Sequence, residues 1–351
     1  MANQSYAVSG LVLGPGSGTV DQIRDLQTDL RSLGYLAGPV GGSIDGQYGT
    51  TTIAGVKALQ IDLTQNDGSS TQKAGEGAAP VAVNSYNTNN SVTDATGTVD
   101  QNLVAIIGAM LDDPNYPPLP KSQNSASDNA AAVAAVKAMS PSQVPIPYLL
   151  AILSQESGQM HYQVPHSGKT DNYVTLGLDH NDKTNPNRVT SRGYGMGQYT
   201  FFHHPPTADE IANSVKDAVG NARGAAAGLL TKFNSYIIGP ADVASDRIAE
   251  FGHVPLRTCQ YTSDDARYMA DCKTCMASAK PLQITAGQTP TYTNSGQTYE
   301  SIAGHVGSYN NVPDRTQIGC DWPYAARRYN GSGPASFDYQ AEVLLKVLNA
   351  H

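Results

Sequence analysis

The chain has 351 residues, which is enough for two or three domains that each bury a core. Charged residues make up only 15% of it, and the formal net charge is −8, with 22 Lys and Arg against 30 Asp and Glu. Nucleic acid is therefore not expected as a partner, because phosphate binding needs clustered cations. A surface that is polar but weakly charged suits a sugar polymer better.

The N-terminus and the apolar runs indicate where the chain is made. No run approaches the roughly 18 apolar residues of a membrane span. The first ten residues lack the basic start and the apolar core of a secretory signal. We therefore expect synthesis in the cytoplasm, no membrane span and a monomer. If the substrate lies outside the cell, another route must deliver the protein.

The first hundred residues predict a small three-helix bundle. Apolar residues recur at helical spacing from residue 20 to 33, from 50 to 60 and from 100 to 110. A glycine turn, Asp45 to Gly49, joins the first two helices, and the polar stretch from about 64 to 93 is an insertion before the third. Ile53, Val56 and Leu59 form the predicted buried face of the second helix, and the residues at helical spacing in the other two are Val20, Ile23, Leu26, Leu30, Leu33, Leu103, Ile106, Ile107 and Met110.

A specific set of residues in this bundle resembles the peptidoglycan-binding domain family. The set consists of Leu26-Gln27, Leu33-Gly34-Tyr35, Asp45-Gly46, Tyr48-Gly49, Thr52 and Gln60, with Gly97-Thr-Val-Asp100 opening the third helix. The resemblance implies a peptidoglycan-binding domain over residues 1–112, with Asp45 and Tyr48 as candidate binding residues. The alternative is that Asp45 caps the turn and Tyr48 packs on the bundle.

Residues 113–128 are rich in Pro and then in Ser and Asn, which predicts a semi-rigid linker. An Ala-rich helix follows from Ala130 to Met139, and Pro145 and Pro147 favour the start of another. We therefore expect a second domain over residues 129–351.

The helix that begins near Pro147 places a carboxyl group at the edge of a buried face. Leu149, Ile152, Leu153 and Glu156 follow the i, i+3, i+4, i+7 spacing of one helix face. A carboxyl group partly sunk among Leu and Ile loses hydration, so we expect its pKa to rise toward the range that suits a proton donor. Glu156 is the candidate general acid. Alternatively, it is a solvated residue at a helix end.

Two later segments carry further polar groups. In Gly193-Tyr-Gly-Met-Gly-Gln-Tyr199, glycines let backbone come close to a ligand, while Gln198 offers a donor and an acceptor. The alternative is an ordinary glycine turn. In Tyr324-Ala-Ala-Arg-Arg-Tyr-Asn-Gly331, an aromatic ring and an amide lie at a helix end stopped by glycine.

Together these segments resemble the three ordered motifs of the lysozyme-like soluble lytic transglycosylases, from about residue 140 to the end. The matches are Glu156-Ser157, Gly195-Met-Gly-Gln198 and Arg328-Tyr-Asn-Gly331, followed by Tyr339 and Val343-Leu344 in a last helix. The chain departs from the family pattern at Gly197, which is an extra residue, and at Arg328, where the family has Ala. The expected fold is mainly α: the three-helix bundle plus a lysozyme-like, mostly helical α+β domain.

The resemblance implies cleavage of the bond between N-acetylmuramic acid and N-acetylglucosamine, with a 1,6-anhydro product. One Glu performs both proton steps, without metal or cofactor, so Glu156 needs no acidic partner. Glycan strands of peptidoglycan are the implied partner, and a phage endolysin or a secreted cell-wall effector is the implied class. The substrate contacts implied are Ser157, Met196, Gln198, Tyr199, Tyr329 and Asn330.

Two alternatives stay open. A hydrolytic lysozyme would need a second carboxylate about 6.5 to 9.5 Å from the acid to activate water. Asp171, Asp179 and Asp182 are the candidates, although they lie in a turn-rich segment typical of a surface loop. A non-catalytic peptidoglycan-binding structural protein is the alternative of another class.

The four cysteines, Cys259, Cys272, Cys275 and Cys320, all lie in the second half of the chain. Cys272 and Cys275 have the spacing of half a zinc site, but the other two stand singly. We expect structural disulfides if the working compartment is oxidising, with zinc ligation and free thiols as alternatives.

Overall fold

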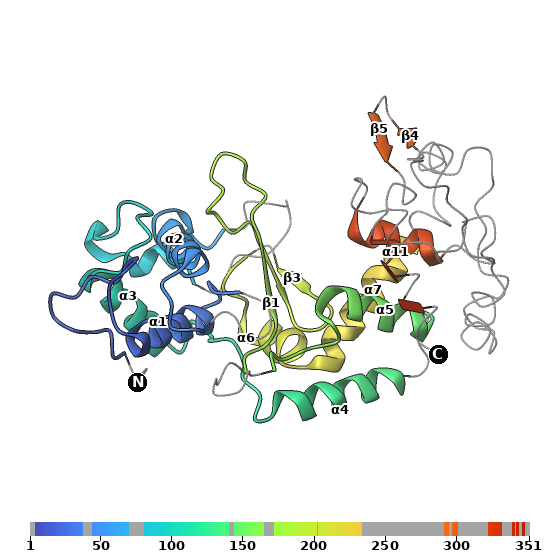
Figure 1. The fold of residues 1–351 in the computed structure, drawn as a ribbon. Helices are drawn as coiled ribbons and strands as arrows, with labels where there is room; N and C mark the ends of the chain where they lie inside the picture. The colour runs from blue at the N-terminus through green and yellow to red at the C-terminus, as the bar shows by residue number, and fades with distance from the viewer. Residues whose placement is uncertain are drawn as a thin grey trace. The chain divides into compact units, whose positions relative to one another are not determined.

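The computed structural model describes most of the first 233 residues and separate segments beyond them. The described residues are 4–37, 44–69, 81–139, 144–164, 172–201, 203–233, 291–294, 297–300 and 322–331, with 339, 340, 342, 343, 346 and 347. The chain divides into two compact units (Figure 1). The first joins Met1–Val133 with Met160–Asn221, and the second joins Ala134–Gln159 with Ala222–His351.

The first unit contains the predicted bundle, formed by α1 (Val20–Ser32), α2 (Thr50–Gln65) and α3 (Gln101–Asp112) (Figure 1). α1 begins with a capping box in which Thr19 and Gln22 satisfy each other's backbone N–H groups. Asp100 caps α3 by accepting from the N–H of Leu103. The apolar stripes of the three helices meet in one core that includes Leu26, Leu59 and Ile107. The prediction of a mainly α fold with this bundle is confirmed.

Two glutamines of the peptidoglycan-binding pattern tie the loops to the bundle. The Gln27 side chain donates to Asp45 Oδ1 at 2.8 Å and accepts from the Gly46 N–H at 2.8 Å. The Gln60 side chain bonds in the same way to the segment before α3, accepting from the Gly97 N–H at 2.8 Å. A buried amide used as both donor and acceptor satisfies polar groups of the loop on both of its sides. These contacts explain why Gln stands at these two positions.

The segment after α3 differs from a free linker. Tyr116 is 1% exposed, and its hydroxyl contacts the Leu33 carbonyl at 3.0 Å and His204 Nε2 at 2.7 Å. The Leu119 N–H donates to the Ser32 carbonyl. A large aromatic ring gains most when it is fully buried with its hydroxyl paired, so this segment packs on the bundle. Two short 3-10 helices, η1 (Val83–Tyr86) and η2 (Thr88–Asn90), lie within the polar insertion.

A small antiparallel sheet completes the first unit. Its strands are β1 (Leu176–Asp179), β2 (Ser191–Tyr194) and β3 (Tyr199–Phe201), in the order β1-β2-β3. Leu178 pairs with Arg192, and Tyr194 pairs with Tyr199. A second core forms around the sheet from Tyr162, Tyr173, Leu176, Tyr194, Phe201 and Val215. Two short helical segments, α6 (Ala208–Glu210) and the π-helical turn η3 (Ile211–Val215), follow the sheet.

The second unit is built on α5 (Ile146–Ser157) and α11 (Trp322–Asn330), which contact each other. Trp322 is fully buried, stacked on Phe233 with ring centroids 4.1 Å apart and next to Tyr148. Phe233 ends α7 (Ala218–Phe233), which crosses the division between the units, as does α4 (Ser125–Lys137). β4 (Thr291–Asn294) and β5 (Gln297–Glu300) form a hairpin, and residues 339–347 include the described residues of a last helix.

Candidate functional site

Glu156 lies near the C-terminal end of α5, as the sequence predicted for this helix. Pro147 lies in its first turn, and Leu149, Ile152 and Leu153 are fully buried. Glu156 is half-buried, one helical turn beyond Ile152 on the same face. Gly158 stops the helix with a left-handed backbone, φ 65°. The carboxyl group therefore sits where the apolar face of the helix gives way to the surface.

A tyrosine from the last helix contacts this carboxyl group. The Tyr339 hydroxyl donates to Glu156 Oε1 at 2.5 Å, across 183 residues of sequence. Tyr339 is 7% exposed, and burial, together with the negative charge of Glu156, raises the pKa of its phenol far above the ordinary value. The phenol therefore keeps its proton at every physiological pH and stays a donor to Glu156. When Glu156 is ionised, this short bond is charge-assisted and among the stronger contacts that a side chain can make.

A second tyrosine, Tyr329, packs against Tyr339. Tyr329, on α11, lies with its ring 6.4 Å from that of Tyr339, at an interplanar angle of 27°. Its pKa is raised by burial and, to a lesser degree, by Glu156. A Cβ on Gly228 of α7 would lie 3.2 Å from the Tyr329 ring, so glycine there lets the ring approach. Two of the aromatic residues named by the transglycosylase resemblance thus gather with Glu156 in the second unit.

The neighbours of Glu156 have structural contacts. The Ser157 hydroxyl donates to the Leu153 carbonyl one turn earlier at 3.1 Å. Lys346 of the last helix donates to Gln155 Oε1 at 2.7 Å and pairs with Glu342 at 3.2 Å. Asn330 is exposed at the end of α11. The last helix is therefore fixed to the end of α5 through two consecutive residues, Gln155 and Glu156.

The glycine run belongs to the first unit and turns the chain from β2 into β3. Gly195 has φ 71°, and a Cβ there would lie 2.5 Å from His161 Cε1 and 2.9 Å from Asn221 Cγ. A Cβ on Gly193 would lie 2.8 Å from Gln198 Oε1. The glycines therefore let the backbone come close to side chains of the same unit, and the approach to a ligand stays a prediction.

Gln198 itself is half-buried, with φ 47°, and its side chain donates to the Gly195 carbonyl at 2.8 Å. Met196 is fully buried, while Tyr199 is 37% exposed beside Phe201, with ring centroids 5.0 Å apart. Of the three, Tyr199 presents the most surface to a ligand. Substrate contacts at Met196, Gln198 and Tyr199 stay predictions.

A buried polar network that the sequence did not reveal holds this turn. Asn221 accepts from the Gly197 N–H at 2.7 Å and donates to the Tyr194 carbonyl at 2.8 Å. His161 Nε2 lies 2.7 Å from the Val215 carbonyl, and its Nδ1 accepts from the Met196 N–H at 3.3 Å. Because a carbonyl can only accept, Nε2 carries the proton of a neutral ring. Burial, which disfavours the charged ring, lowers the pKa of His161 to about 4.

Two of the candidates for a second carboxylate, Asp179 and Asp182, lie in the hairpin of the first unit. Asp179 accepts from the Ser191 hydroxyl at 2.6 Å. Asp182 accepts from the hydroxyl and the N–H of Thr184, and these bonds lower its pKa. It also lies 3.7 Å from Arg188. These bonds order the loop between β1 and β2. Asp171 lies outside the described residues, as do all four cysteines.

In the bundle, both candidate binding residues are engaged with the protein. Asp45 accepts from Gln27 and also from the Gln47 N–H at 2.9 Å, which is the geometry of an Asx turn. Tyr48 is 8% exposed, and its hydroxyl donates to the Gly97 carbonyl at 2.9 Å. These contacts account for both residues structurally, and a direct contact with peptidoglycan stays a prediction for each.

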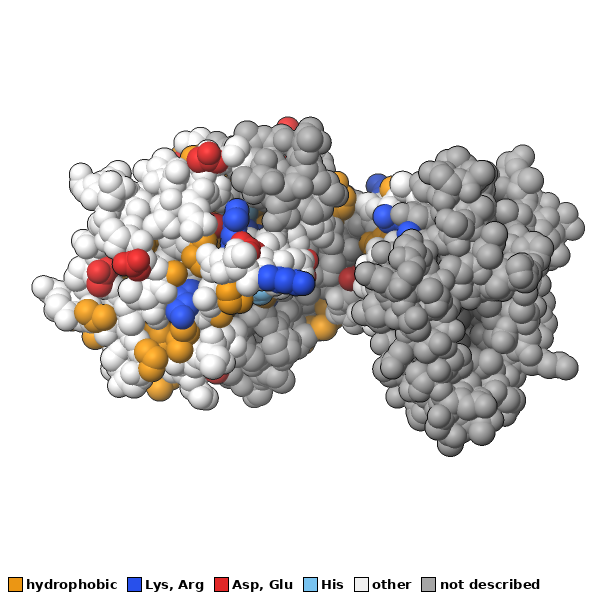
Figure 2. Space-filling model, turned by 90° about the horizontal axis from the view of Figure 1, so that it is seen from above, with side chains coloured by type: hydrophobic (Ala, Val, Ile, Leu, Met, Phe, Trp, Pro, Cys, Tyr) orange, Lys and Arg blue, Asp and Glu red, His pale blue; other side chains and the backbone are white. Residues whose placement is uncertain are grey.

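The described surface carries mixed side chains. On the face in Figure 2, acidic, basic and apolar groups of the described residues are scattered among uncharged polar ones. Within the same described residues, no helix has both the length and the hydropathy to cross a membrane.

The comparison with protein families gives a match in the N-terminal part of the chain. Residues 19–68, which include α1 and α2, match the family model of the peptidoglycan binding domain. The chain contains an N-terminal peptidoglycan-binding domain. Peptidoglycan is accordingly its supported partner, and the cell wall its supported place of action. No curated protein and no solved structure matches the chain.

Proposed function

We propose that the chain is a peptidoglycan-cleaving enzyme in which Glu156 is the single catalytic acid. The observation that supports this most is the hydrogen bond between Tyr339 and Glu156. It brings together two segments that the transglycosylase resemblance names independently, at a carboxyl group that is neither fully buried nor fully solvated. The binding domain would hold the enzyme on its polymer and raise the local concentration of substrate.

The chemistry proposed is that of a lytic transglycosylase. Glu156 gives its proton to the glycosidic oxygen, and the carboxylate so formed takes a proton from the C6 hydroxyl of muramic acid as the 1,6-anhydro ring closes. The Tyr339 hydroxyl is a better partner for the carboxylate than for the neutral acid. It therefore stabilises Glu156 most after the first proton has left, which lowers the barrier to bond cleavage.

Product analysis tests this proposal. Purified peptidoglycan is digested with the full chain, and the soluble products are analysed by mass spectrometry. We expect 1,6-anhydro-muropeptides, whereas reducing ends would assign the hydrolytic alternative. Glu156→Gln keeps the shape of the side chain and removes its acid, so it should lower activity at least a thousandfold, or about 4 kcal/mol. Glu342→Gln, a carboxylate on the last helix, is the matched control and should retain activity.

Absence of any soluble product from the unaltered chain, with binding to the wall intact, would favour the non-catalytic peptidoglycan-binding protein. Full activity in Glu156→Gln would overturn the assignment of the acid while leaving the binding domain untouched.

A further inference from the structure

One face of α2 lines two cavities of the first unit. The residues that face them recur at helical spacing: Thr51, Ala54, Gly55, Ala58, Asp62, Gln65 and Asn66. The opposite wall of both cavities comes from the hairpin of β1 and β2 and its loop. Because Leu178 and Arg192 are cross-strand partners, their side chains lie on the same face of that hairpin. Both cavities therefore lie along one strip, defined as the side of α2 that faces the hairpin.

The cavity near the start of α2 is apolar. Its volume is about 250 Å³, and Ala54, Gly55 and Ala58 line it on the helix side. Leu36 and Leu178 contribute to the opposite side. A Cβ on Gly55 would lie 2.7 Å from the Tyr35 carbonyl oxygen, so glycine here lets the helix come close to that backbone. The short side chains leave room that small alkyl groups of a ligand can fill.

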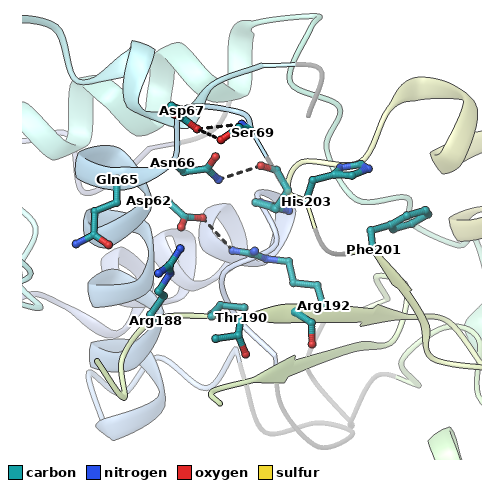
Figure 3. Close-up of a pocket in the computed structure, with 13 residues that line it drawn as sticks. Asp62, Gln65, Asn66, Asp67, Ser69, Arg188, Thr190, Arg192, Phe201 and His203 are labelled. Carbon is teal, nitrogen blue, oxygen red and sulfur yellow. Dashed lines mark hydrogen bonds and ion pairs between the residues drawn. The ribbon is translucent and has the colours of Figure 1, made fainter. Parts of the chain in front are cut away.

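The cavity near the end of α2 is charged (Figure 3). Arg192 and Arg188 both point from the hairpin side toward α2, where Asp62 pairs with Arg192 at 3.2 Å. Asp67 lies on the rim, and its pKa is lowered by hydrogen bonds from Ser69, so it is ionised at neutral pH. The volume is about 50 Å³, which holds a few water-sized groups and is too small for a sugar ring.

The contacts of Arg192 leave part of its guanidinium available. Its Nε donates to the Gly34 carbonyl at 3.1 Å, and one terminal nitrogen bonds Asp62. A guanidinium has five N–H donors, so further ones remain on a side chain that lines the cavity. A carboxylate is the group that such donors bind best.

The length of the strip indicates the size of a ligand. Ala54 on α2 and Asn66, which directly follows the helix, are twelve residues apart, which corresponds to roughly 18 Å along the helix axis. An extended peptide of four or five residues spans roughly 13 to 18 Å. The strip thus offers an apolar end and an end that carries guanidinium donors at the spacing of a short peptide.

We propose that this strip binds the stem peptide of peptidoglycan and not its glycan strand. The glycan consists of uncharged N-acetylated sugars, whereas the stem peptide carries alanine methyl groups and ionised carboxylates. The methyl groups would enter the apolar cavity, and a carboxylate would accept from Arg192 and Arg188. This inference rests on the peptidoglycan binding that the family match supports, and it is independent of cleavage at Glu156.

Titration calorimetry of the full chain tests the inference with two soluble probes. One is the synthetic tetrapeptide L-Ala–γ-D-Glu–meso-diaminopimelate–D-Ala, and the other is the peptide-free sugar chitotetraose. We expect the tetrapeptide to bind and chitotetraose to leave the strip unoccupied. A tetrapeptide with amidated carboxyl groups should bind at least tenfold more weakly, because it no longer offers an anion to the two arginines.

Two variants with matched controls locate the site. Ala54→Leu fills the apolar cavity, and Arg188→Gln removes one cation; each should raise the dissociation constant of the tetrapeptide at least tenfold. Ala105→Leu adds the same side chain to an exposed position of α3. Arg24→Gln removes an arginine that is similarly exposed, 39% against 34%, and likewise paired with an Asp. Both controls should change the constant less than twofold.

No binding of the tetrapeptide, or binding that neither Ala54→Leu nor Arg188→Gln weakens, would overturn the inference. Chitotetraose binding that Ala54→Leu abolishes would assign the strip to the glycan instead. Glu156→Gln should leave the tetrapeptide constant unchanged, so failure of the catalytic proposal is distinguished from failure of this one.

Discussion

Replacing Gly195 by Ala tests the structural reason for the glycine run. The new Cβ would lie 2.5 Å from His161 Cε1 and 2.6 Å from Nδ1, well inside van der Waals contact. His161 cannot easily move away, because hydrogen bonds hold both of its ring nitrogens. Gly195 also has φ 71°, which a side chain disfavours by about 1–2 kcal/mol. With about 1–3 kcal/mol for overpacking, we expect a total destabilisation of about 2–5 kcal/mol.

Gly16→Ala is the matched control, because it separates the two contributions. Gly16 has φ 78°, yet a Cβ there would meet nothing within 4 Å. It should therefore show only the conformational cost of about 1–2 kcal/mol. Urea unfolding followed by circular dichroism measures both variants, and hydrogen exchange of the β2–β3 amides assigns the loss to the first unit. If the two variants lost the same stability, the close packing of His161 against Gly195 would be refuted.

Two further predictions concern titratable groups. Tyr339→Phe should lower kcat about tenfold or more with little change in KM, and it should move the alkaline limb of the pH–rate profile to higher pH, because the carboxylate of Glu156 loses its donor and the protonated acid is favoured. The pKa of His161 is about 4 in the folded protein and about 6.5 in the unfolded chain. Its contribution to the free energy of unfolding is therefore complete above pH 6.5 and is lost as the pH falls through 4. Relative to His161→Gln, wild type should lose on the order of 3 kcal/mol of its free energy of unfolding across this range. Asp29, whose pKa is raised to about 6, has the opposite effect, but it is present in both proteins and cancels in the difference. A constant difference between the two proteins from pH 7 to pH 4 would contradict the neutral buried ring.

The helices of the bundle and α5 could be predicted from sequence because their signals are local. Apolar spacing, Thr19 and Asp100 as caps, and Gly158 as a stop all lie within a few residues of the features that they determine. The family pattern added the loops of the bundle, since Gln27 and Gln60 bond to the segments that the pattern names. The helix signals span a few residues each, and the family pattern names both partners of each loop contact.

The long-range contacts could not be predicted. Nothing near Tyr339 indicates a bond to a carboxyl group 183 residues earlier, and nothing near His161 indicates that its ring supports a turn at Gly195. The prolines around Tyr116 predict a linker. In the structure, the Tyr116 ring packs this segment into the core, and its hydroxyl contacts the Leu33 carbonyl and His204. Single aromatic and histidine residues carry no periodic pattern, so their partners emerge only from the tertiary structure.

The shared core of the first unit limits how the binding module can be transplanted. The family match ends at residue 68, and the three-helix bundle ends with α3, but Asp62 faces Arg192 and Gly34 is covered by the ring of His204. A fragment cut after α3 would leave the Asp62 carboxylate without its cation and would expose Gly34 and Tyr35, against which the His204 ring packs. A fusion partner or affinity reagent made from this chain should therefore carry residues 160–221 together with residues 1–133.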